Sequence, residues 1–300
     1  MKKKTYLFAL MAMALTLGSC SDNENGIGGE TSKYITVSTS IGNMTRVATD
    51  EKGGQTFEEG DEISVYAWTG DATVAPETRE RVVNNAINKL TNGSWISNPQ
   101  MLWKNNHDKH YFIGVYPISA ISDLSAGEYT FDETKQVESD LLVAVNKDGL
   151  SYNVDEQQPV PLTFTHVMAK LVVNLTYKNQ WGGIPTVEKV VVGNAAKEAT
   201  INYLTKVVTP STTAKEDFSL PEITENTKYV SVIIPQEEVT QLTIVIGGKN
   251  FVYDNGTPFK LESGKITTVN LEVGRDEIKL GDVKITNWED GSTFSGEALN

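Results

Sequence analysis

The residue with the most distinctive chemistry in this 300-residue sequence is Cys20, the only cysteine. A thiol can form a disulfide, bind a metal or carry a covalent group, and a lone cysteine cannot form a disulfide within its own chain. Leu17, Gly18 and Ser19 come directly before it. The two small residues leave the backbone open to a peptidase, and the Cys20 thiol is the atom that could carry a covalent group.

The segment before Cys20 is typical of an export signal. Three lysines at positions 2–4 precede an apolar run over residues 6–17, which is too short to cross a bilayer. A buried core helix is the alternative, but the basic start, the apolar run and a tetrapeptide that resembles the bacterial lipobox coincide. The lipobox resemblance implies cleavage between Ser19 and Cys20 and attachment of a diacylglycerol to the Cys20 thiol. We predict a lipoprotein signal peptide over residues 1–19 and a polar, glycine-rich, flexible tether over residues 20–33.

The residues after Cys20 bear on the location of the protein. The acidic tract Ser21-Asp22-Asn23-Glu24 resembles the surface-export signal of Bacteroidetes lipoproteins. A solvated linker would have the same composition. We expect a lipoprotein of the outer membrane, displayed on the cell surface and anchored by acyl chains such as palmitate.

The net negative charge of the chain limits the kinds of molecule that it is expected to bind. The chain has 26 Lys and Arg against 39 Asp and Glu, a net charge of −13. Removal of residues 1–19 would delete three lysines, which leaves 23 basic against 39 acidic residues and a net charge of −16. Such a surface repels nucleic acid and anionic membranes. We therefore expect no nucleic-acid partner.

None of the three histidines lies in a sequence pattern that is typical of a catalytic or metal-binding site. His107 and His110 are three residues apart, but no cysteine or His-Glu motif lies near them to complete a metal site. A polar turn before the strand at 111–116 explains the pair better. His166 lies beside apolar residues, where a structural role is favoured over a general base. We predict no metal site, no cofactor and no enzymatic activity.

Carboxylates and tryptophans are the remaining chemical groups. Acidic residues cluster at 58–62 and 289–290. Glycoside hydrolysis would need two carboxylates facing across a cleft, and solvated acidic turns are the simpler interpretation. Tryptophans could form a sugar-stacking platform, although scattered aromatic residues in strands usually pack in the core. The chain has five: Trp68, Trp95, Trp103, Trp181 and Trp288.

Alternation of apolar and polar residues dominates the chain and is typical of half-buried strands. The runs are rich in β-branched residues, and most end at Gly, Pro, Asn or Asp, as at Asn92-Gly93 and Gly247-Gly248. Short helices are expected at 77–86 and 195–199. We predict an all-β protein with antiparallel β-sandwiches and small helical inserts. The clearest strands are at 35–41, 63–67, 171–177, 190–192, 229–234, 242–246 and 266–273.

The chain length and the position of two prolines suggest two domains. About 280 residues remain after the signal peptide, which is more than one small core needs. Pro159 and Pro161 precede a long strand, so we place the junction near residues 160–170. The prediction is an N-terminal sandwich over residues 34–165 and a C-terminal sandwich over residues 166–300.

The order of landmarks, behind the lipobox-like start, resembles the fimbrillin-like (Mfa-like) surface lipoproteins of Bacteroides and Porphyromonas, the type V pilus subunits. The resemblance covers nearly the whole chain. The landmarks are the strand 35–41, Thr45-Arg46-Val47, the segment 57–66, Ser94-Trp95, Leu102-Trp103, the segments 111–117, 139–144 and 160–171, Ile234-Pro235-Gln236 and Ile285-Thr286-Asn287-Trp288.

The resemblance implies two transthyretin-like β-sandwich domains and assembly into a surface pilus (fimbria) with other pilus subunits. It also implies that a trypsin-like protease cuts the lipid-anchored precursor after an arginine near the first strand, which opens a groove for a neighbour's strand. Arg46, followed by Val47, is the matching position, and the cut would remove the strand at 34–46. Competing basic sites are Arg79, Arg81 and Arg275.

The C-terminal tail, residues 277–300, is the candidate donor strand. Its apolar positions are Ile278, Leu280, Val283 and Ile285. The alternative is that these residues close their own domain. A second function stays open beside the pilus subunit: a permanently lipid-anchored protein that serves as pilus anchor or binds a host or glycan ligand.

Overall fold

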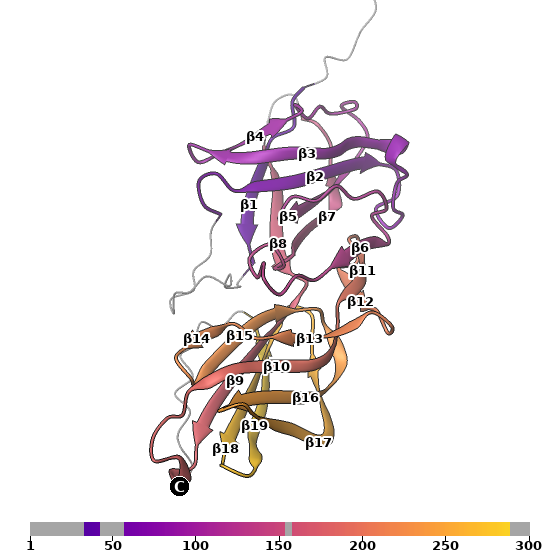
Figure 1. The fold of residues 1–300 in the computed structure, drawn as a ribbon. Helices are drawn as coiled ribbons and strands as arrows, with labels where there is room; N and C mark the ends of the chain where they lie inside the picture. Colours follow the sequence, from indigo (N-terminus) through magenta and orange to yellow (C-terminus); the bar gives the residue numbers. More distant parts are fainter. Residues whose placement is uncertain (1–32, 43–56, 154–157, 289–300) are drawn as a thin grey trace, which may run out of the picture. The chain divides into compact units, whose positions relative to one another are not determined.

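The computed structural model describes residues 33–42, 57–153 and 158–288. These residues form nineteen strands and two 3-10 helices of three residues each, with no α-helix among them (Figure 1). They belong to one compact unit that spans residues 32–300. The prediction of an all-β protein is confirmed.

The predicted helix at 77–86 is wrong, as is the one at 195–199. Only η1, Thr78–Glu80, is helical in the first region, and β3 begins directly after it at Arg81. The β-branched Val82 and Val83 fit a strand better than a helix because their side chains crowd the helical turn. In the second region β10 ends at Ala196 and β11 begins at Glu198. The second 3-10 helix, η2, is Asn179–Trp181.

One sheet contains seven strands, all from residues 37–166. Neighbouring strands are antiparallel except the first pair, which is parallel, so the sheet is mixed rather than antiparallel throughout. Its inward side chains form one hydrophobic cluster. In spatial order the strands are β1 Val37–Ile41, β8 Val160–His166, β7 Leu142–Leu150, β5 His110–Tyr116, β2 Glu62–Thr69, β3 Arg81–Thr91 and β4 Ser94–Asn98.

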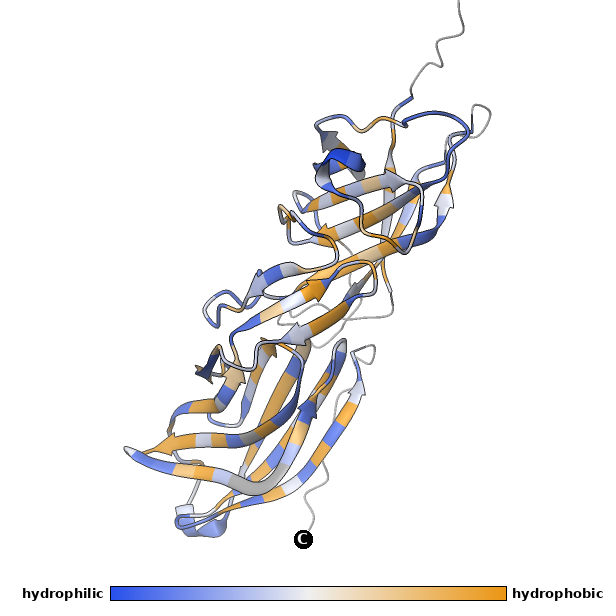
Figure 2. Ribbon diagram, turned by 90° about the vertical axis from the view of Figure 1, so that its right-hand side faces the viewer, coloured by the Kyte–Doolittle hydropathy of each residue, from blue (hydrophilic) through white to orange (hydrophobic). Residues whose placement is uncertain are grey.

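Two more sheets are built from residues 169–287, and buried side chains of both belong to one hydrophobic cluster. Orange and blue bands alternate along many of their strands, as expected for strands with one face in the core (Figure 2). The four-stranded sheet is β13 Lys215–Ser219, β10 Val187–Ala196, β16 Gln236–Ile246 and β17 Lys249–Leu261. The five-stranded sheet is β14 Glu222–Thr224, β15 Lys228–Ile233, β9 Ala169–Tyr177, β18 Lys265–Val273 and β19 Ile278–Asn287.

A small third sheet joins the two halves of the sequence. β6 (Gly127–Thr130) pairs antiparallel with β11 (Glu198–Asn202), which also pairs with β12 (Val207–Pro210). The large hydrophobic cluster likewise includes residues from both halves, among them Leu124 and Ile201. The two halves therefore share part of their core.

Two predicted turns have the expected backbone. Asn92 and Gly93, between β3 and β4, have φ values of 51° and 73°, and Gly247 and Gly248, between β16 and β17, have φ values of 58° and 71°. Positive φ at both central residues is the geometry of the two-residue hairpin turn that matches the twist of the flanking strands. Asn and Gly are the residues that adopt it most readily.

Candidate functional site

β1 lies at one edge of the seven-stranded sheet and pairs in parallel with β8 alone. Paired positions share a face, so the inward residues of β1 stand beside those of β8. Val37 and the preceding Ile35 are 6% and 1% exposed, and Ile41 packs against the same cluster. Burial of each such side chain contributes about 1.5–3 kcal/mol. β1 is thus an edge strand that fills part of the core.

Polar contacts also hold this first strand. The indole N–H of Trp95 on β4 donates a 2.9 Å hydrogen bond to Oγ1 of Thr39 on β1. The hydroxyls of Ser40 and Thr163 lie 3.1 Å apart. Ahead of the strand, the N–H of Ile35 donates to the carbonyl of Met101 at 2.9 Å. The segment is therefore fixed from both sides, by β8 and by residues that belong to or follow β4.

The core beneath β1 is apolar and closely packed. β8 contributes Val160, Leu162 and Phe164, which are 0%, 1% and 0% exposed. Phe57 packs edge-on against Phe164, with ring centroids 5.1 Å apart, and against Trp95 at 5.2 Å. If β1 were absent, the inner face of β8 would lose its cover along one side.

β19 is the edge strand of the five-stranded sheet and pairs antiparallel with β18 over its whole length. The pairing shifts register once: Leu280 lies opposite Leu271 and Asp282 opposite Asn270. Gly281 is left without an opposite residue and forms a bulge. The four candidate donor residues named from the sequence all lie on this strand, paired within their own chain.

The apolar residues of β19 are covered unequally. Val283 and Ile285 are 36% and 38% exposed, although they lie opposite Val269 and Thr267, which are both completely buried. Opposite residues in an antiparallel pair point to the same face. Val283 and Ile285 therefore point toward the core side of the sheet at an edge that leaves them partly open to solvent.

His166, at the end of β8, is buried. Its Nδ1 lies 2.6 Å from Oδ1 of Asp140, and its ring stacks on Trp288 with centroids 4.0 Å apart. The sequence interpretation of a structural histidine agrees with this position. Sequence reasoning missed Asp140 as its partner and gave Trp288 no role beyond packing or stacking. The segments 139–144, 160–171 and 285–288 were among the family landmarks, but nothing in the sequence paired them.

The other two histidines lie in the loop before β5 and at its start, as expected for a polar turn. The Lys104 N–H donates to Nε2 of His110 at 3.1 Å, and Nδ1 of His110 lies 3.0 Å from the carbonyl of Asp108. Burial lowers the pKa of His110, which favours the neutral ring. Both ring nitrogens are engaged, so His110 offers no free ligand atom, and His107 is exposed and contacts Asp108.

The acidic residues at 58–62 form local hydrogen bonds and an ion pair. The Glu58 N–H donates to Oδ2 of Asp61 at 2.7 Å, and the Asn92 N–H donates to Oε1 of Glu59 at 2.7 Å. Glu62 forms an ion pair with Lys89 at 3.0 Å. These contacts fit the simpler interpretation of solvated acidic turns. Residues 289–290, the second acidic cluster, lie outside the described residues.

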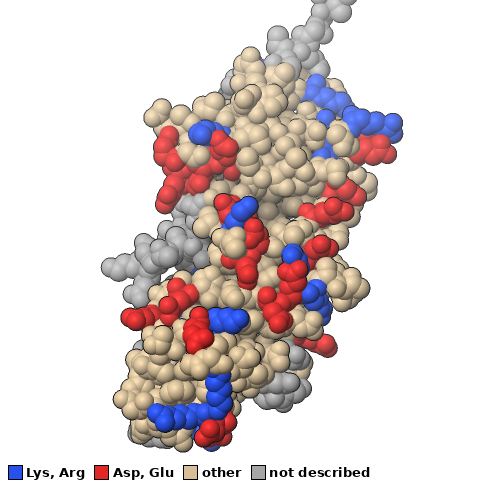
Figure 3. Space-filling model, in the orientation of Figure 1, with Lys and Arg blue, Asp and Glu red and all other residues tan. Residues whose placement is uncertain are grey.

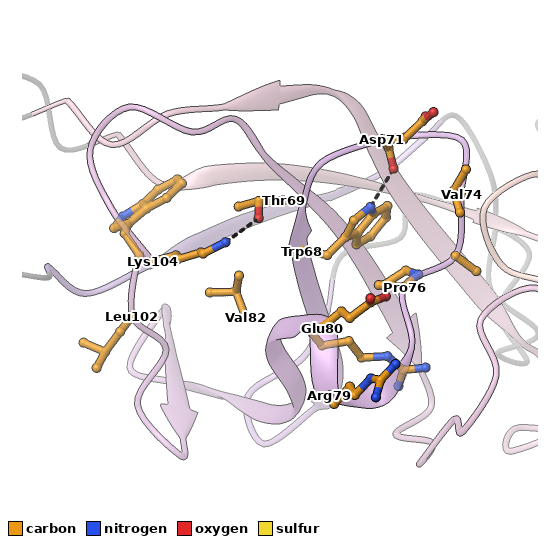
Figure 4. A pocket seen from close by; sticks show the side chains of 13 residues that line it. Trp68, Thr69, Asp71, Val74, Pro76, Arg79, Glu80, Val82, Leu102 and Lys104 are labelled. Carbon is orange, nitrogen blue, oxygen red and sulfur yellow. Dashed lines mark hydrogen bonds between the residues drawn. The ribbon is translucent and has the colours of Figure 1, made fainter.

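An open pocket of about 800 Å³ lies beside the start of β3 (Figure 4). Val82 and Leu102 form its apolar part, and Lys104 reaches across to Oγ1 of Thr69 at 3.2 Å. Glu80 also lines the pocket. Its two tryptophans, Trp68 and Trp103, are only 1% and 7% exposed and present little stacking face. Of the remaining three, Trp288 is buried, and Trp95 and Trp181 are half-buried.

The surface drawn in Figure 3 carries separate groups of acidic and basic side chains rather than one continuous field of either sign. Within residues 33–42, 57–153 and 158–288, no group of three metal-ligating side chains is close enough to hold an ion. In the same residues, no helix is long and apolar enough to cross a membrane.

Four predicted site residues lie outside the described part of the chain. They are Ser19 and Cys20 at the predicted signal cleavage and lipidation site, and Arg46 and Val47 at the predicted protease site. Arg46 follows the last described residue of the first segment, Gly42, by four positions. These assignments stay predictions.

The chain is similar to known surface proteins. It is 24% identical over 316 residues to the "Putative fimbrium subunit Fim1C" of Bacteroides uniformis, a match that covers 97% of each chain. Its fold is similar to the crystal structure of "a putative cell adhesion protein" from Bacteroides ovatus, with a TM-score of 0.64, 17% identity and coverage of 86% and 98% of the two chains. The tip fimbrial protein Mfa3 of Porphyromonas gingivalis, with C-terminal truncation, gives a TM-score of 0.51, 11% identity and coverage of 86% and 100%.

The family assignment rests on a match over most of the sequence. The model of the fimbrillin-like family matches residues 45–288, a stretch that begins after β1 and ends at the buried Trp288. The family is structural rather than enzymatic, and membership implies association with other pilus subunits. The chain therefore belongs to the fimbrillin-like family of cell-surface fimbrial proteins.

Proposed function

We propose that this protein is a structural subunit of a pilus that is exported as a lipoprotein precursor and polymerises by strand exchange. In this scheme, cleavage between Ser19 and Cys20 exposes the lipid-bearing cysteine, and acyl chains anchor the precursor in the outer membrane. A trypsin-like protease then cuts between Arg46 and Val47. Loss of the N-terminal segment, with β1, opens the seven-stranded sheet to a strand from a neighbouring subunit.

The observation that carries the proposal is the position of β1. It is an edge strand whose only strand pairing within the described residues is the parallel one with β8, and residues 43–56 connect it to the rest of the chain. One cut at Arg46 would leave β1 attached to the folded body by noncovalent contacts alone. The inward residues of β1 fill an apolar slot against β8, so their replacement by a neighbour's strand would restore both the backbone pairing and the buried area.

The C-terminal strand is the proposed donor. Val283 and Ile285 point toward the core side of their sheet yet remain more than a third exposed. β19 is also an edge strand, paired on one side only. Apolar side chains on an edge strand match the alternate pockets that an added strand fills. The alternative from the sequence, that β19 closes its own domain, agrees with its pairing to β18 in the isolated chain.

We also propose that the two halves are transthyretin-like sandwiches that meet between residues 165 and 166. In support, every strand of the seven-stranded sheet lies within residues 37–166, and every strand of the four- and five-stranded sheets lies within residues 169–287. Val167 and Met168 are the only residues between β8 and β9.

The test is the mature N-terminus of the protein on intact cells, read by mass spectrometry in the wild type and in Arg46→Ala. A terminus at Val47 that disappears in Arg46→Ala, together with loss of polymer, supports the proposal. A lipidated terminus at Cys20 in both would contradict processing and favour a permanently anchored protein. Arg79→Ala is the matched control, because Arg79 is an exposed basic residue beyond the family position.

The pocket beside β3 favours a second function, adhesion through a host or glycan ligand. Its lining combines apolar side chains, such as Val82 and Leu102, with hydrogen-bonding side chains, such as Thr69, Glu80 and Lys104. A glycan array probed with the intact monomer tests it. Binding that is lost in Lys104→Glu and kept in Lys109→Glu, a charge reversal outside the pocket, would support the site, and no binding by the wild type would remove it.

A further inference from the structure

Trp288, directly after the edge strand β19, is completely buried. Its ring lies flat against His166, with centroids 4.0 Å apart and planes inclined by 8°. Its backbone N–H donates to the carbonyl of Gly264 at 3.3 Å. A large aromatic side chain therefore fixes the end of a strand whose own apolar residues, Val283 and Ile285, are partly exposed.

Asp140 holds the partner ring in place. Its Oδ1 lies 2.6 Å from Nδ1 of His166, and the side chains of Asp140 and His166 are 3% and 0% exposed. With the carboxylate ionised, Nδ1 of His166 carries the hydrogen and is the donor. Lys170 on β9 places its ammonium group 5.7 Å from the centroid of the Trp288 ring, within reach of a cation–π attraction. His166 and Lys170 thus lie against Trp288, and Asp140 is bonded to His166.

The cluster lies where the chain passes from β8 to β9. In that corner the Val167 N–H donates to the carbonyl of Leu141 at 3.0 Å, and the Gly264 N–H donates to the carbonyl of Met168 at 2.9 Å. Since Gly264 also accepts from Trp288, the corner, the turn before β18 and the end of β19 are linked. Asn287, the last residue of β19 and the partner of Lys265, is therefore adjacent in the chain to a side chain that is fixed in this corner.

Two buried polar atoms suggest that the cluster serves more than stability. Oδ2 of Asp140 and Nε2 of His166 have no hydrogen-bond partner within the described part of the chain. A buried polar atom without a partner is costly, and an apolar pair of the same shape would avoid that cost. The Asp140–His166 pair nevertheless sets the orientation of the ring on which Trp288 stacks.

We propose that Asp140 and His166 are positioning residues for a latch, in which Trp288 keeps β19 in its own sheet until a neighbouring subunit takes its C-terminal strand. This inference rests on the proposed strand exchange and adds its control step. Release of Trp288 from His166 precedes donation of β19. Weakening the latch opens β19 more often and lets the processed subunit polymerise faster.

Hydrogen exchange of the full-length monomer tests the latch without any assembly. In Trp288→Ala, the amides of β19 should exchange at least tenfold faster, while those of the central strand β9 keep their wild-type rates. Trp288→Phe retains an aromatic ring and should restore most of the protection. Trp181→Ala is the matched control, because the half-buried Trp181 contacts the carbonyl of Val273 on β18 and lies outside the cluster.

If the amides of β19 exchange at the wild-type rate in Trp288→Ala, the latch proposal is overturned. If Trp288→Ala accelerates exchange in every strand, Asp140→Asn decides the question, because it keeps the size of the side chain. Faster exchange confined to β19 in Asp140→Asn supports the proposal, and wild-type protection of β19 overturns it.

A second experiment measures polymerisation after treatment with trypsin. A latch that gates assembly predicts faster growth of the polymer ladder in Asp140→Asn than in the wild type. Faster β19 exchange with an unchanged ladder would overturn the gating role. A wild-type protein that is cut at Arg46 and never polymerises would instead refute the proposed function, while the exchange data would still decide whether Trp288 holds β19.

Discussion

The indole N–H of Trp95 donates a 2.9 Å hydrogen bond to Oγ1 of Thr39, and this contact joins the two opposite edges of one sheet. Thr39 lies on β1 and Trp95 on β4, which are the first and last strands in the order of the seven-stranded sheet. The sheet therefore curls until its edges meet, with Phe57 packed against both Trp95 and Phe164 inside it. Loss of β1 would break this closure as well as one strand pairing.

The first prediction concerns this contact between the edges. Trp95→Phe removes the donor and keeps an aromatic ring, so the free energy of unfolding should fall by about 0.5–1.5 kcal/mol, the net worth of one hydrogen bond. Urea unfolding followed by circular dichroism measures it. Dissociation of the N-terminal peptide after cleavage at Arg46 should also accelerate in this variant.

A double-mutant cycle with Thr39→Val isolates the hydrogen bond from the change in ring size. The effects of Trp95→Phe and Thr39→Val should not add, because each removes the same interaction. Additive losses would show that the bond contributes nothing and that the smaller ring accounts for the change.

The second prediction concerns Gly114, which lies close to two side chains of β8. A Cβ added at Gly114 on β5 would lie 2.6 Å from Cζ of Phe164 and 3.1 Å from Cδ1 of Leu162. Overpacking of this kind costs about 1–3 kcal/mol, so Gly114→Ala should lower the urea midpoint. Gly42→Ala is the control, because its nearest contact would be an ordinary 3.4 Å to Cγ2 of Thr163. Equal midpoints for Gly114→Ala and the wild type would show that Phe164 moves aside freely.

Local sequence predicts much of this fold where the signal is contained in neighbouring residues. Asn92-Gly93 and Gly247-Gly248 form the expected hairpin turns because their conformation depends on the residues themselves. The helix expected at 77–86 failed because β3 pairs with both β2 and β4 and buries Val83 and Ala86. Tertiary pairing there overrides the local preference.

The candidate site depends on contacts that the sequence does not encode locally. His166 is buried, as its apolar neighbours in the sequence predict, but Asp140 is 26 residues away and Trp288 follows the edge strand of another sheet. The apolar alternation of β19 was visible in the sequence. The partial exposure of its side chains could not be predicted, because exposure depends on which strand occupies the edge of the sheet.

The third prediction concerns acid stability. Asp71, Asp123 and Asp132 each accept hydrogen bonds at Oδ1 from the backbone N–H and the hydroxyl of the residue two positions later. These bonds lower the pKa of each carboxyl below its ordinary value of 3.8. The stabilisation is therefore complete above pH 3.8 and is lost as pH falls through the lower folded-state pKa values.

Stability to urea should accordingly fall as the pH drops below 3.8, and the triple variant Asp71→Asn, Asp123→Asn, Asp132→Asn should show a smaller fall. Asn keeps an acceptor oxygen in the turn but has no charge to lose. Control substitutions Glu128→Gln and Asp148→Asn change charge at positions for which no such turn is present among the hydrogen bonds of the described residues. An identical pH dependence in wild type and triple variant would refute the assignment.

The last prediction tests the donor strand directly. Ile285 is 38% exposed in the isolated chain, so Ile285→Asp should leave the folded body intact, whereas a buried aspartate without a partner would prevent insertion into a neighbour. Circular dichroism should match the wild type, and the protease-dependent polymer ladder should disappear. Ile184→Asp is the matched control, because Ile184 is 64% exposed and lies between η2 and β10, outside the strands. A folded Ile285→Asp protein that still polymerises would exclude β19 as the donor and leave it as the strand that closes its own sheet.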